Sequence, residues 1–424
     1  MRICGGLVVT DAGSREADVF VAGTRIAAIE PPTAGGALDA RGCVVLPGGV
    51  DPHTHPLSGL ASATTAAGHG GTTTVFGFTS PRPGESPGAA WRRAVREQLP
   101  QATVDVSLHP AIWEPDRLTR ADLEELSALG ASSVKLYLAY PELGMMASDR
   151  TLYETLRASV ELGLLVMVHC ENGGAIEARV EEQLAHGATG VEGFVAARPP
   201  GVEEEAVART LALARLAEAP VYLVHLSSAG SLDLVREARA RGQTVVAEAC
   251  THHLLLDESC YERPDAARWV TVPPLRRRLD VEALWDAVLD GTLDTIGSDH
   301  AQVAYRPSFR GDDFRALPYG FPGIETRVPL VLSEGTRRGV PLERLAALLA
   351  TTPARSFRRM DTGAIVPGAV ADLLVWDPST RWTVDPSRLH GGHDSTPYDG
   401  LGVTGQIRTV IRAGTVLHGP AGPT

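Results

Sequence analysis

The chain has 424 residues, 44% hydrophobic and 21% charged, a composition typical of a globular protein with one large domain and a smaller one. Its net charge of −12 argues against a nucleic-acid-binding surface, and no apolar run approaches the roughly 20 residues that a membrane-spanning helix needs. The five cysteines are odd in number and widely spaced, which predicts a reducing cytoplasm rather than a disulfide framework.

Residues 1–47 predict short strands joined by turns, because they have no helical period. Eight apolar runs rich in Val, Ile or Leu follow, at 44–55, 72–78, 104–112, 132–138, 164–170, 221–227, 244–250 and 294–300. The segments between most of them have helical spacing, so strands alternating with helices predict an α/β fold, a (β/α)8 TIM barrel over 48–362. A doubly wound sheet is the alternative. Residues 363–424 again predict short strands, which we expect to pair with 1–47 in one small β domain.

Lys135 is the single lysine among 39 basic residues. Arginine has taken the other basic positions, so the lysine at position 135 is either a chance survival or marks a position where arginine does not serve. A guanidinium stays protonated, whereas a partly buried lysine can lose its proton and act as a nucleophile. The lone lysine therefore predicts a chemical role rather than a surface charge.

Metal-competent side chains recur at the carboxyl ends of five predicted strands. They are His53 and His55 in the first, Lys135 in the fourth, His169 in the fifth, His225 in the sixth and Asp299 in the eighth. These ends converge on one face of a barrel, and alternate residues such as His53 and His55 share the inward face. One such histidine could be structural, but six groups together predict a metal site. Nitrogen and oxygen ligands without a thiolate suit Zn²⁺ first, with Mn²⁺, Co²⁺ or Fe²⁺ also compatible.

The sequence resembles the amidohydrolase superfamily, and more closely its hydantoinase and dihydropyrimidinase branch. The matching strings are GGVDPHTH (48–55), SSVKLYLAY (132–140), VMVHCEN (166–172), RPPGVEEEAVAR (198–209), VYLVHLS (221–227), VPPLR (272–276), GSDH (297–300), GDDF (311–314), GFPGIETR (320–327) and GAIVPGAVADLLVWD (363–377). The resemblance implies a barrel over 48–362, a β-sandwich domain from 1–47 plus 363–424, and a homo-oligomer, either dimer or tetramer.

The resemblance also implies a binuclear centre. One divalent metal ion would bind His53, His55 and Asp299, the other His169 and His225, and Lys135 carboxylated by CO2 would bridge them. A lysine amine can add CO2 to give a bidentate carbamate, which a guanidinium cannot, and this accounts for the single lysine. A hydroxide bridging two metals would attack the ring, with Asp299 as the proton acceptor. Tyr140 matches the family tyrosine that steadies the developing oxyanion.

Three departures from the family concern the substrate. The segment from His55 to Gly70 is shorter than in hydantoinases, Tyr319 replaces the asparagine that usually contacts the ring amide, and Val272 replaces a serine. We expect a hydrolase that opens a small-molecule cyclic amide, imide or ureide related to hydantoin or dihydropyrimidine, with a preference for a bulkier ring. Another amidohydrolase, such as a dihydroorotase, an allantoinase or a specialised amide hydrolase, is the alternative. Leu57 stands where dihydroorotases carry an arginine. A non-catalytic scaffold is less favoured because all six metal candidates are present.

Other polar residues are less specific. His252 and His253 follow the seventh predicted strand and fit either a pocket or the core. The charge run at 203–205 predicts a solvated helix start.

Overall fold

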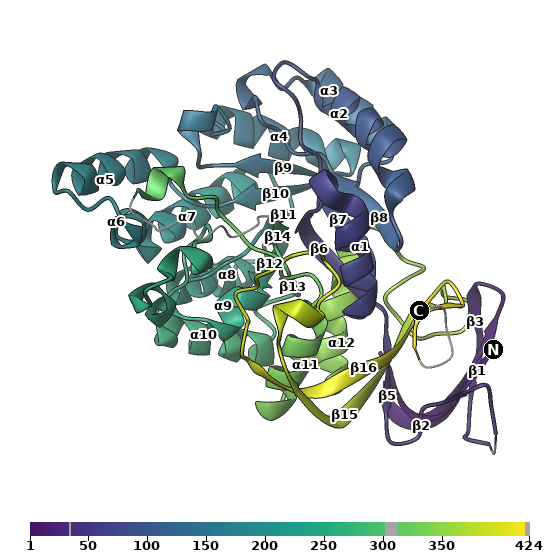
Figure 1. Ribbon diagram of the computed structural model, residues 1–424. Helices are drawn as coiled ribbons and strands as arrows, with labels where there is room; N and C mark the ends of the chain where they lie inside the picture. The colour runs from purple at the N-terminus through teal and green to yellow at the C-terminus, as the bar shows by residue number, and fades with distance from the viewer. Residues whose placement is uncertain (34, 302–312, 420–424) are drawn as a thin grey trace.

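The computed structural model describes residues 1–33, 35–301 and 313–419. A barrel of parallel strands surrounded by helices forms the larger part of the molecule, and a sheet built from both ends of the chain lies beside it (Figure 1). This arrangement confirms the predicted fold class. The domain limits, 1–47 plus 363–424 and 48–362, stay a prediction.

The barrel strands follow one another in chain order around the barrel. They are β6 (Gly49–His55), β7 (Thr72–Phe78), β8 (Asp105–His109), β9 (Ser133–Tyr137), β10 (Leu165–His169), β11 (Val221–Leu223), β12 (Val245–Cys250) and β13 (Thr295–Gly297), with the short β14 (His300–Ala301) also pairing with β6. The helices are α1 (Leu60–His69), α2 (Pro87–Arg93), α3 (Arg120–Ala128), α4 (Asp149–Leu162), α5 (Gly173–Ala185), α6 (Val191–Ala197), α7 (Pro200–Leu216), α8 (Ala229–Ala240), α9 (Thr251–Leu255), α10 (Arg278–Asp290), α11 (Arg327–Arg337), α12 (Leu342–Ala346) and α13 (Thr352–Ser356).

Two seams close the barrel, and both contain predicted site residues. Between β8 and β9, the backbone N–H of Lys135 donates to Pro110 O (2.8 Å) and its carbonyl accepts from Ile112 N (3.0 Å). Beyond β13, the N–H of Asp299 donates to His53 O (3.0 Å). Closing the barrel therefore fixes the heights of these three site residues along the strands.

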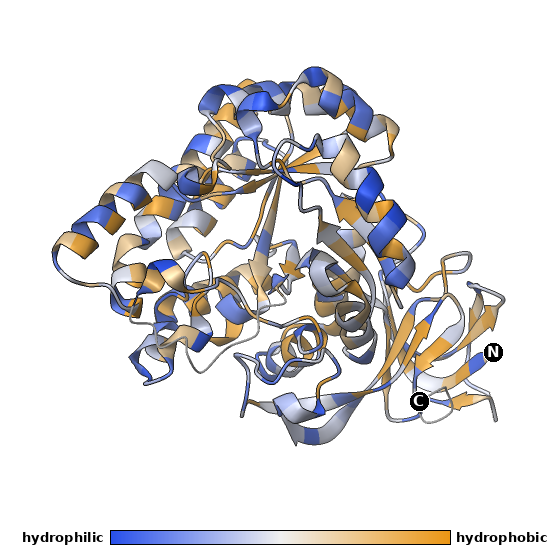
Figure 2. Ribbon diagram, turned by 45° about the horizontal axis from the view of Figure 1, so that its top comes forward, coloured by the Kyte–Doolittle hydropathy of each residue, from blue (hydrophilic) through white to orange (hydrophobic). Residues whose placement is uncertain are grey.

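The strands are buried on both faces, as their apolar sequences predict. Inward side chains such as Phe76, Tyr137 and Met167 fill the barrel, while outward ones such as Val134 and Val166 pack under the helices. Figure 2 shows the strands mostly hydrophobic and the helices of mixed character. No helix in the described part of the chain combines the length and apolar character that a membrane crossing would need.

The second sheet joins the two ends of the chain. Its order is β17-β16-β15-β5-β1-β2-β3, with β4 on β1. The strands are β1 (Arg2–Thr10), β2 (Gly13–Ala22), β3 (Arg25–Glu30), β4 (Leu38–Asp39), β5 (Val44–Pro47), β15 (Leu373–Thr383), β16 (Gly402–Arg412) and β17 (Thr415–His418). Apolar side chains from both ends, including Val19, Val45 and Leu373, form its own core.

The run 44–55, predicted as one strand, is divided between the two sheets. β5 pairs with β1 and β15, whereas β6 enters the barrel. The chain passes between them at Gly48, where a β-carbon would lie only 2.6 Å from Thr73 Cγ2. Close packing against β7 thus places a glycine where the apolar run changes sheets.

Candidate metal centre

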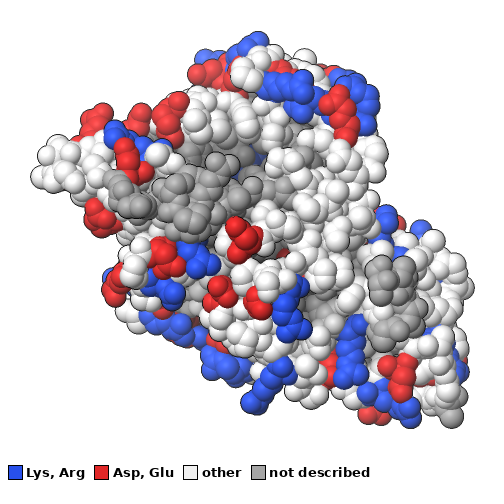
Figure 3. Space-filling model, in the orientation of Figure 1, with Lys and Arg blue, Asp and Glu red and all other residues white. Residues whose placement is uncertain are grey.

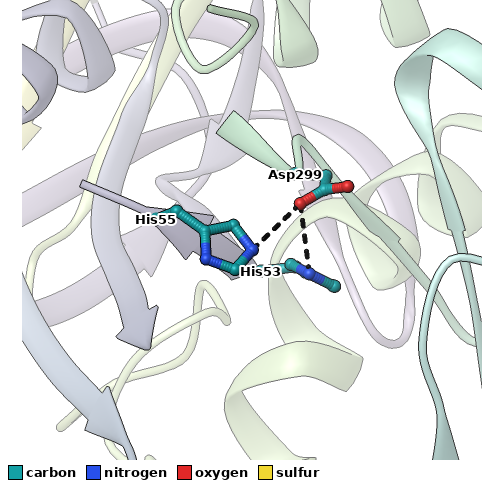
Figure 4. Close-up of side chains that lie close together, drawn as sticks. All are labelled: His53, His55 and Asp299. Carbon is teal, nitrogen blue, oxygen red and sulfur yellow. Dashed lines mark ion pairs between the residues drawn. The ribbon is translucent and has the colours of Figure 1, made fainter. Parts of the chain in front are cut away.

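The first cluster joins the β6 histidines to the acid that follows β13. Asp299 Oδ1 lies 3.2 Å from Nε2 of both His53 and His55 (Figure 4). The three side chains each offer a ligand atom within 4.8 Å of the others. This spacing fits three ligands of one ion.

The second cluster comes from the ends of β10 and β11. His169, at the end of β10, has Nδ1 2.9 Å from Nε2 of His225, which follows β11. The His53 and His225 ring centroids are 5.3 Å apart, so the two clusters adjoin. The fold therefore brings all four predicted histidines and Asp299 into one site.

Lys135 reaches the same interior. Its side chain is buried, and no described residue hydrogen-bonds to Nζ, which lies 5.1 Å from the Phe78 ring centroid and 5.2 Å from that of Tyr137. Burial lowers the pKa of Lys135 to about 8, although the carboxylates of Glu248 and Asp299 oppose the shift. An unpaired buried ammonium is costly, so the position favours a neutral amine.

Two buried glutamates, not predicted from the sequence, orient the histidines. His53 Nδ1 lies 2.6 Å from Glu248 Oε1, and His169 Nε2 lies 2.9 Å from Glu171 Oε2. A carboxylate on one ring nitrogen sets the tautomer and leaves the other nitrogen for a metal. In both cases the remaining nitrogen is the one that faces the neighbouring candidate ligand.

Glu248 also links the two clusters. It accepts hydrogen bonds from the backbone N–H of His225 (3.0 Å) and from the hydroxyl of Tyr222 (2.7 Å). The available signal was an acid inside the apolar run TVVAEAC, because a carboxylate on a strand buried on both faces requires partners.

The charges in the first cluster are strongly coupled. Burial by itself would raise the pKa of Asp299, but His53 and His55 hold it well below its usual value. Burial lowers the pKa of His53, yet Glu248 and Asp299 outweigh this and raise it to about 9. The cluster thus keeps Asp299 ionised and attracts positive charge.

Three predicted site residues have left-handed backbone conformations. φ is 38° at His225, 49° at Asp299 and 65° at Tyr140. Such strain costs about 1–3 kcal/mol per residue and persists only where the surrounding structure imposes it, which is typical of functional sites.

The predicted substrate residues lie together on one side of the centre. The Tyr140 ring centroid is 5.1 Å from that of His169. Val272 is buried in an apolar cluster with Phe314, and both Tyr140 and Tyr319 pack against that cluster. Positions 311 and 312 of the matched string GDDF lie outside the described residues.

The prediction of a solvated helix start at 203–205 was wrong for Glu203. This side chain is buried and accepts hydrogen bonds from the backbone N–H groups of Ser227 (3.0 Å) and Ser228 (3.1 Å). Arg276 supplies the opposite charge, with Nη2 3.4 Å from Glu203 Oε2. Packing of α7 on the end of β11 turns one acid of the run inward.

The seventh-strand histidines differ from each other. His253 Nε2 lies 3.1 Å from Pro273 O, a structural contact. His252 is buried with neither ring nitrogen hydrogen-bonded to a described residue, and it has a possible ligand atom within 4.8 Å of Asp299. His252 therefore borders the candidate centre.

Comparisons with known proteins cover nearly the whole chain. Residues 44–417 match the amidohydrolase family. D-hydantoinase from Ralstonia pickettii is 36% identical over 436 residues, which cover 98% of this chain and 94% of the relative. The solved structures of D-hydantoinase from Bacillus sp. AR9 and dihydropyrimidinase from Brevibacillus agri have TM-scores of 0.93, at 35% and 34% identity. Each alignment covers 99% of this chain and 95% of the solved chain. The chain belongs to the amidohydrolase family.

Proposed function

We propose that this protein is a metal-dependent hydrolase that opens a cyclic amide, imide or ureide ring, with hydantoin or dihydropyrimidine as the nearest models. One observation carries the proposal: two adjoining clusters of nitrogen and oxygen ligands meet beside the buried Lys135 at the carboxyl end of the barrel strands. The near full-length similarity to D-hydantoinases supports the choice of ring.

The residues present fit two divalent metal ions. His53, His55 and Asp299 would hold one, His169 and His225 the other, and a CO2-modified Lys135 would join them. The fit is supported by the buried Nζ, which has no hydrogen-bond partner in the described part of the chain, and by the ring nitrogens that Glu248 and Glu171 leave available. Zn²⁺ suits this donor set best, with Mn²⁺, Co²⁺ or Fe²⁺ compatible. When bound, such a metal pair supplies a nucleophile at neutral pH and polarises the scissile carbonyl.

The side chains around this centre would handle protons and charge. Asp299 is ionised and accepts a proton, which it passes to the leaving ring nitrogen. Burial holds the pKa of Tyr140 well above its usual value, so its hydroxyl keeps a proton to donate to the developing oxyanion.

A metal analysis followed by a substrate screen tests the proposal. We expect two metal ions per chain and ring opening of a hydantoin, detected as the acyclic product by mass spectrometry. The screen includes dihydrouracil, dihydroorotate, allantoin and a cyclic imide. Metal-loaded protein that opens none of these rings would contradict the proposal.

We also propose that the protein is a cytoplasmic dimer or tetramer. All five cysteines are free thiols, which is compatible with a reducing compartment. Leu216 and Leu279 are 66% and 74% exposed on helices of the barrel, where a subunit contact would cover them. Light scattering of the purified protein distinguishes these assemblies from a monomer.

A further inference from the structure

A cavity of about 350 Å³ lies next to the candidate centre, between the loop after β9, helix α5 and the segment that precedes α7. Its walls include Tyr140, Glu171, Val180, Arg198, Phe314 and Tyr319. Figure 3 shows this face of the molecule hollowed near the middle of the barrel. The cavity adjoins the centre through Tyr140, whose ring approaches His169.

Arg198 brings a buried positive charge to this cavity. It is only 6% exposed, and its Nε and Nη1 atoms have no hydrogen-bond partner among the described residues. The guanidinium carbon lies 4.7 Å from the Phe194 ring centroid and 5.6 Å from that of Tyr319, whose side chain also hydrogen-bonds to it. A buried guanidinium with open donors is costly unless an acceptor completes it.

A buried network holds Arg198 in place from behind. Its carbonyl accepts a 2.5 Å hydrogen bond from Arg276 Nη1. Arg276 Nε donates to Ser227 Oγ (2.9 Å), and its Nη2 pairs with the buried Glu203. The backbone of Arg198 is thus fixed before any ligand arrives, which reduces the entropy lost on binding.

The exposed charges around the cavity do not compete with Arg198. Glu142, Glu177, Glu181 and Arg315 are exposed at its rim, where solvent screens them. The buried Glu171 is engaged with His169 through Oε2, whereas its Oε1 has no hydrogen-bond partner among the described residues. Arg198 is therefore the buried positive charge of the cavity, with donors that are unpaired among the described residues, and the carboxylate of Glu171 is its buried negative charge.

We propose that this cavity receives an exocyclic arm of the cyclic substrate, and that the arm ends in a carboxylate bound by Arg198 and the Tyr319 hydroxyl. The inference rests on the proposed function and names its substrate class, a cyclic amide with an acidic arm. Val180 and Phe314 cover the methylene groups of the arm. A carboxylate supplies acceptors that Arg198 does not find among the described residues, and charge-assisted hydrogen bonds of this kind are the strong ones.

The test compares three hydantoins whose arms have similar size but different ends: 2-carboxyethyl, 2-carbamoylethyl and propyl. In the wild-type protein, kcat/KM should be about 10- to 100-fold higher for the carboxylate than for the carboxamide. Arg198→Met should remove the preference for the carboxylate, and Tyr319→Phe should reduce the ratio several-fold. Arg315→Met removes an exposed cation from the rim of the same cavity and should leave the ratio unchanged.

The outcomes separate the two proposals. A wild-type protein that hydrolyses the neutral hydantoins but shows no preference for the carboxylate overturns the acidic arm alone. If Arg198→Met lowers kcat/KM equally for all three substrates, the acidic arm is also overturned, since Arg198 would then act only on the fold. If Arg198→Met does not fold, the wild-type ratio and the Tyr319→Phe protein decide. Metal-loaded protein that opens none of the three rings overturns both proposals.

Discussion

At the scale of single residues, Lys135 is the side chain on which the proposed centre depends. Its amine is buried without a hydrogen-bond partner among the described residues, and its backbone forms the seam between β8 and β9. Lys135→Ala should bind metal more than about 100-fold more weakly and lose activity with it. Even a residue that only hydrogen-bonds to a metal ligand contributes about 10- to 100-fold to metal affinity, and a direct ligand should contribute more. Metal titration and kcat measure this, and short carboxylates should restore part of both. A Lys135→Arg protein with two metals and full rate would refute the role.

A variant of Asp299 can separate its proposed role as a metal ligand from its proposed role as the base. Asp299→Asn keeps an oxygen atom at the position and tolerates its left-handed φ of 49°, but it removes the proton acceptor. We expect kcat to fall by about 10²–10⁴-fold with at least one metal retained. Near-normal kcat in a variant with wild-type metal content would exclude Asp299 as the base.

Glu248 should act through the histidines that it orients. Glu248→Gln weakens the acceptor facing His53 Nδ1 and the His225 backbone N–H, so metal affinity should fall by about 10- to 100-fold. Glu203→Gln is the control, because Glu203 is equally buried but contacts no proposed ligand, and its metal affinity should match wild type. An equal loss in both variants would mean that Glu248 supports only the fold.

At the scale of elements, the turn from α1 to β7 is set by close contact rather than by propensity. A β-carbon at Gly70 would lie 2.7 Å from Glu325 Cα, so this turn packs directly on the segment that precedes α11. Gly70→Ala should lower the free energy of unfolding by about 1–3 kcal/mol through overpacking. Gly201→Ala in α7 is the matched control, because a β-carbon there meets no atom within 4 Å and should not destabilise. Urea unfolding at equilibrium measures both, and equal midpoints for the two variants would contradict the prediction.

At the scale of the whole molecule, the proposed ligands lie on or directly after five barrel strands, β6, β9, β10, β11 and β13, and include residues of both closing seams. Bound metals should therefore stabilise the entire barrel. A ligand at 100 times its dissociation constant stabilises a fold by about 2.7 kcal/mol, so chelation should lower Tm by several degrees and added Zn²⁺ should restore it. Calorimetry with and without chelator checks this, with Lys135→Ala as a protein whose Tm should hardly respond. The same Tm for metal-loaded and stripped wild type would argue against the centre.

The sequence by itself determined the barrel and the positions of its polar strand ends. Strands buried on both faces require apolar sequences. Polar residues at their carboxyl ends, such as His53 and His169, are therefore recognisable in the sequence. The rarity of lysine pointed to Lys135 in the same way. These features are local, so they can be recognised from the sequence alone. The metal and substrate roles of these residues stay predictions.

Only the tertiary structure decided which side chains meet. His53 and Glu248 are 195 positions apart, and no periodic pattern records that their side chains touch. The same is true of the inward turn of Glu203, the change of sheet at Gly48 and the Arg198 donors that have no partner among the described residues. Each depends on packing between distant segments, because burial and the direction of a polar group are set by its neighbours in space.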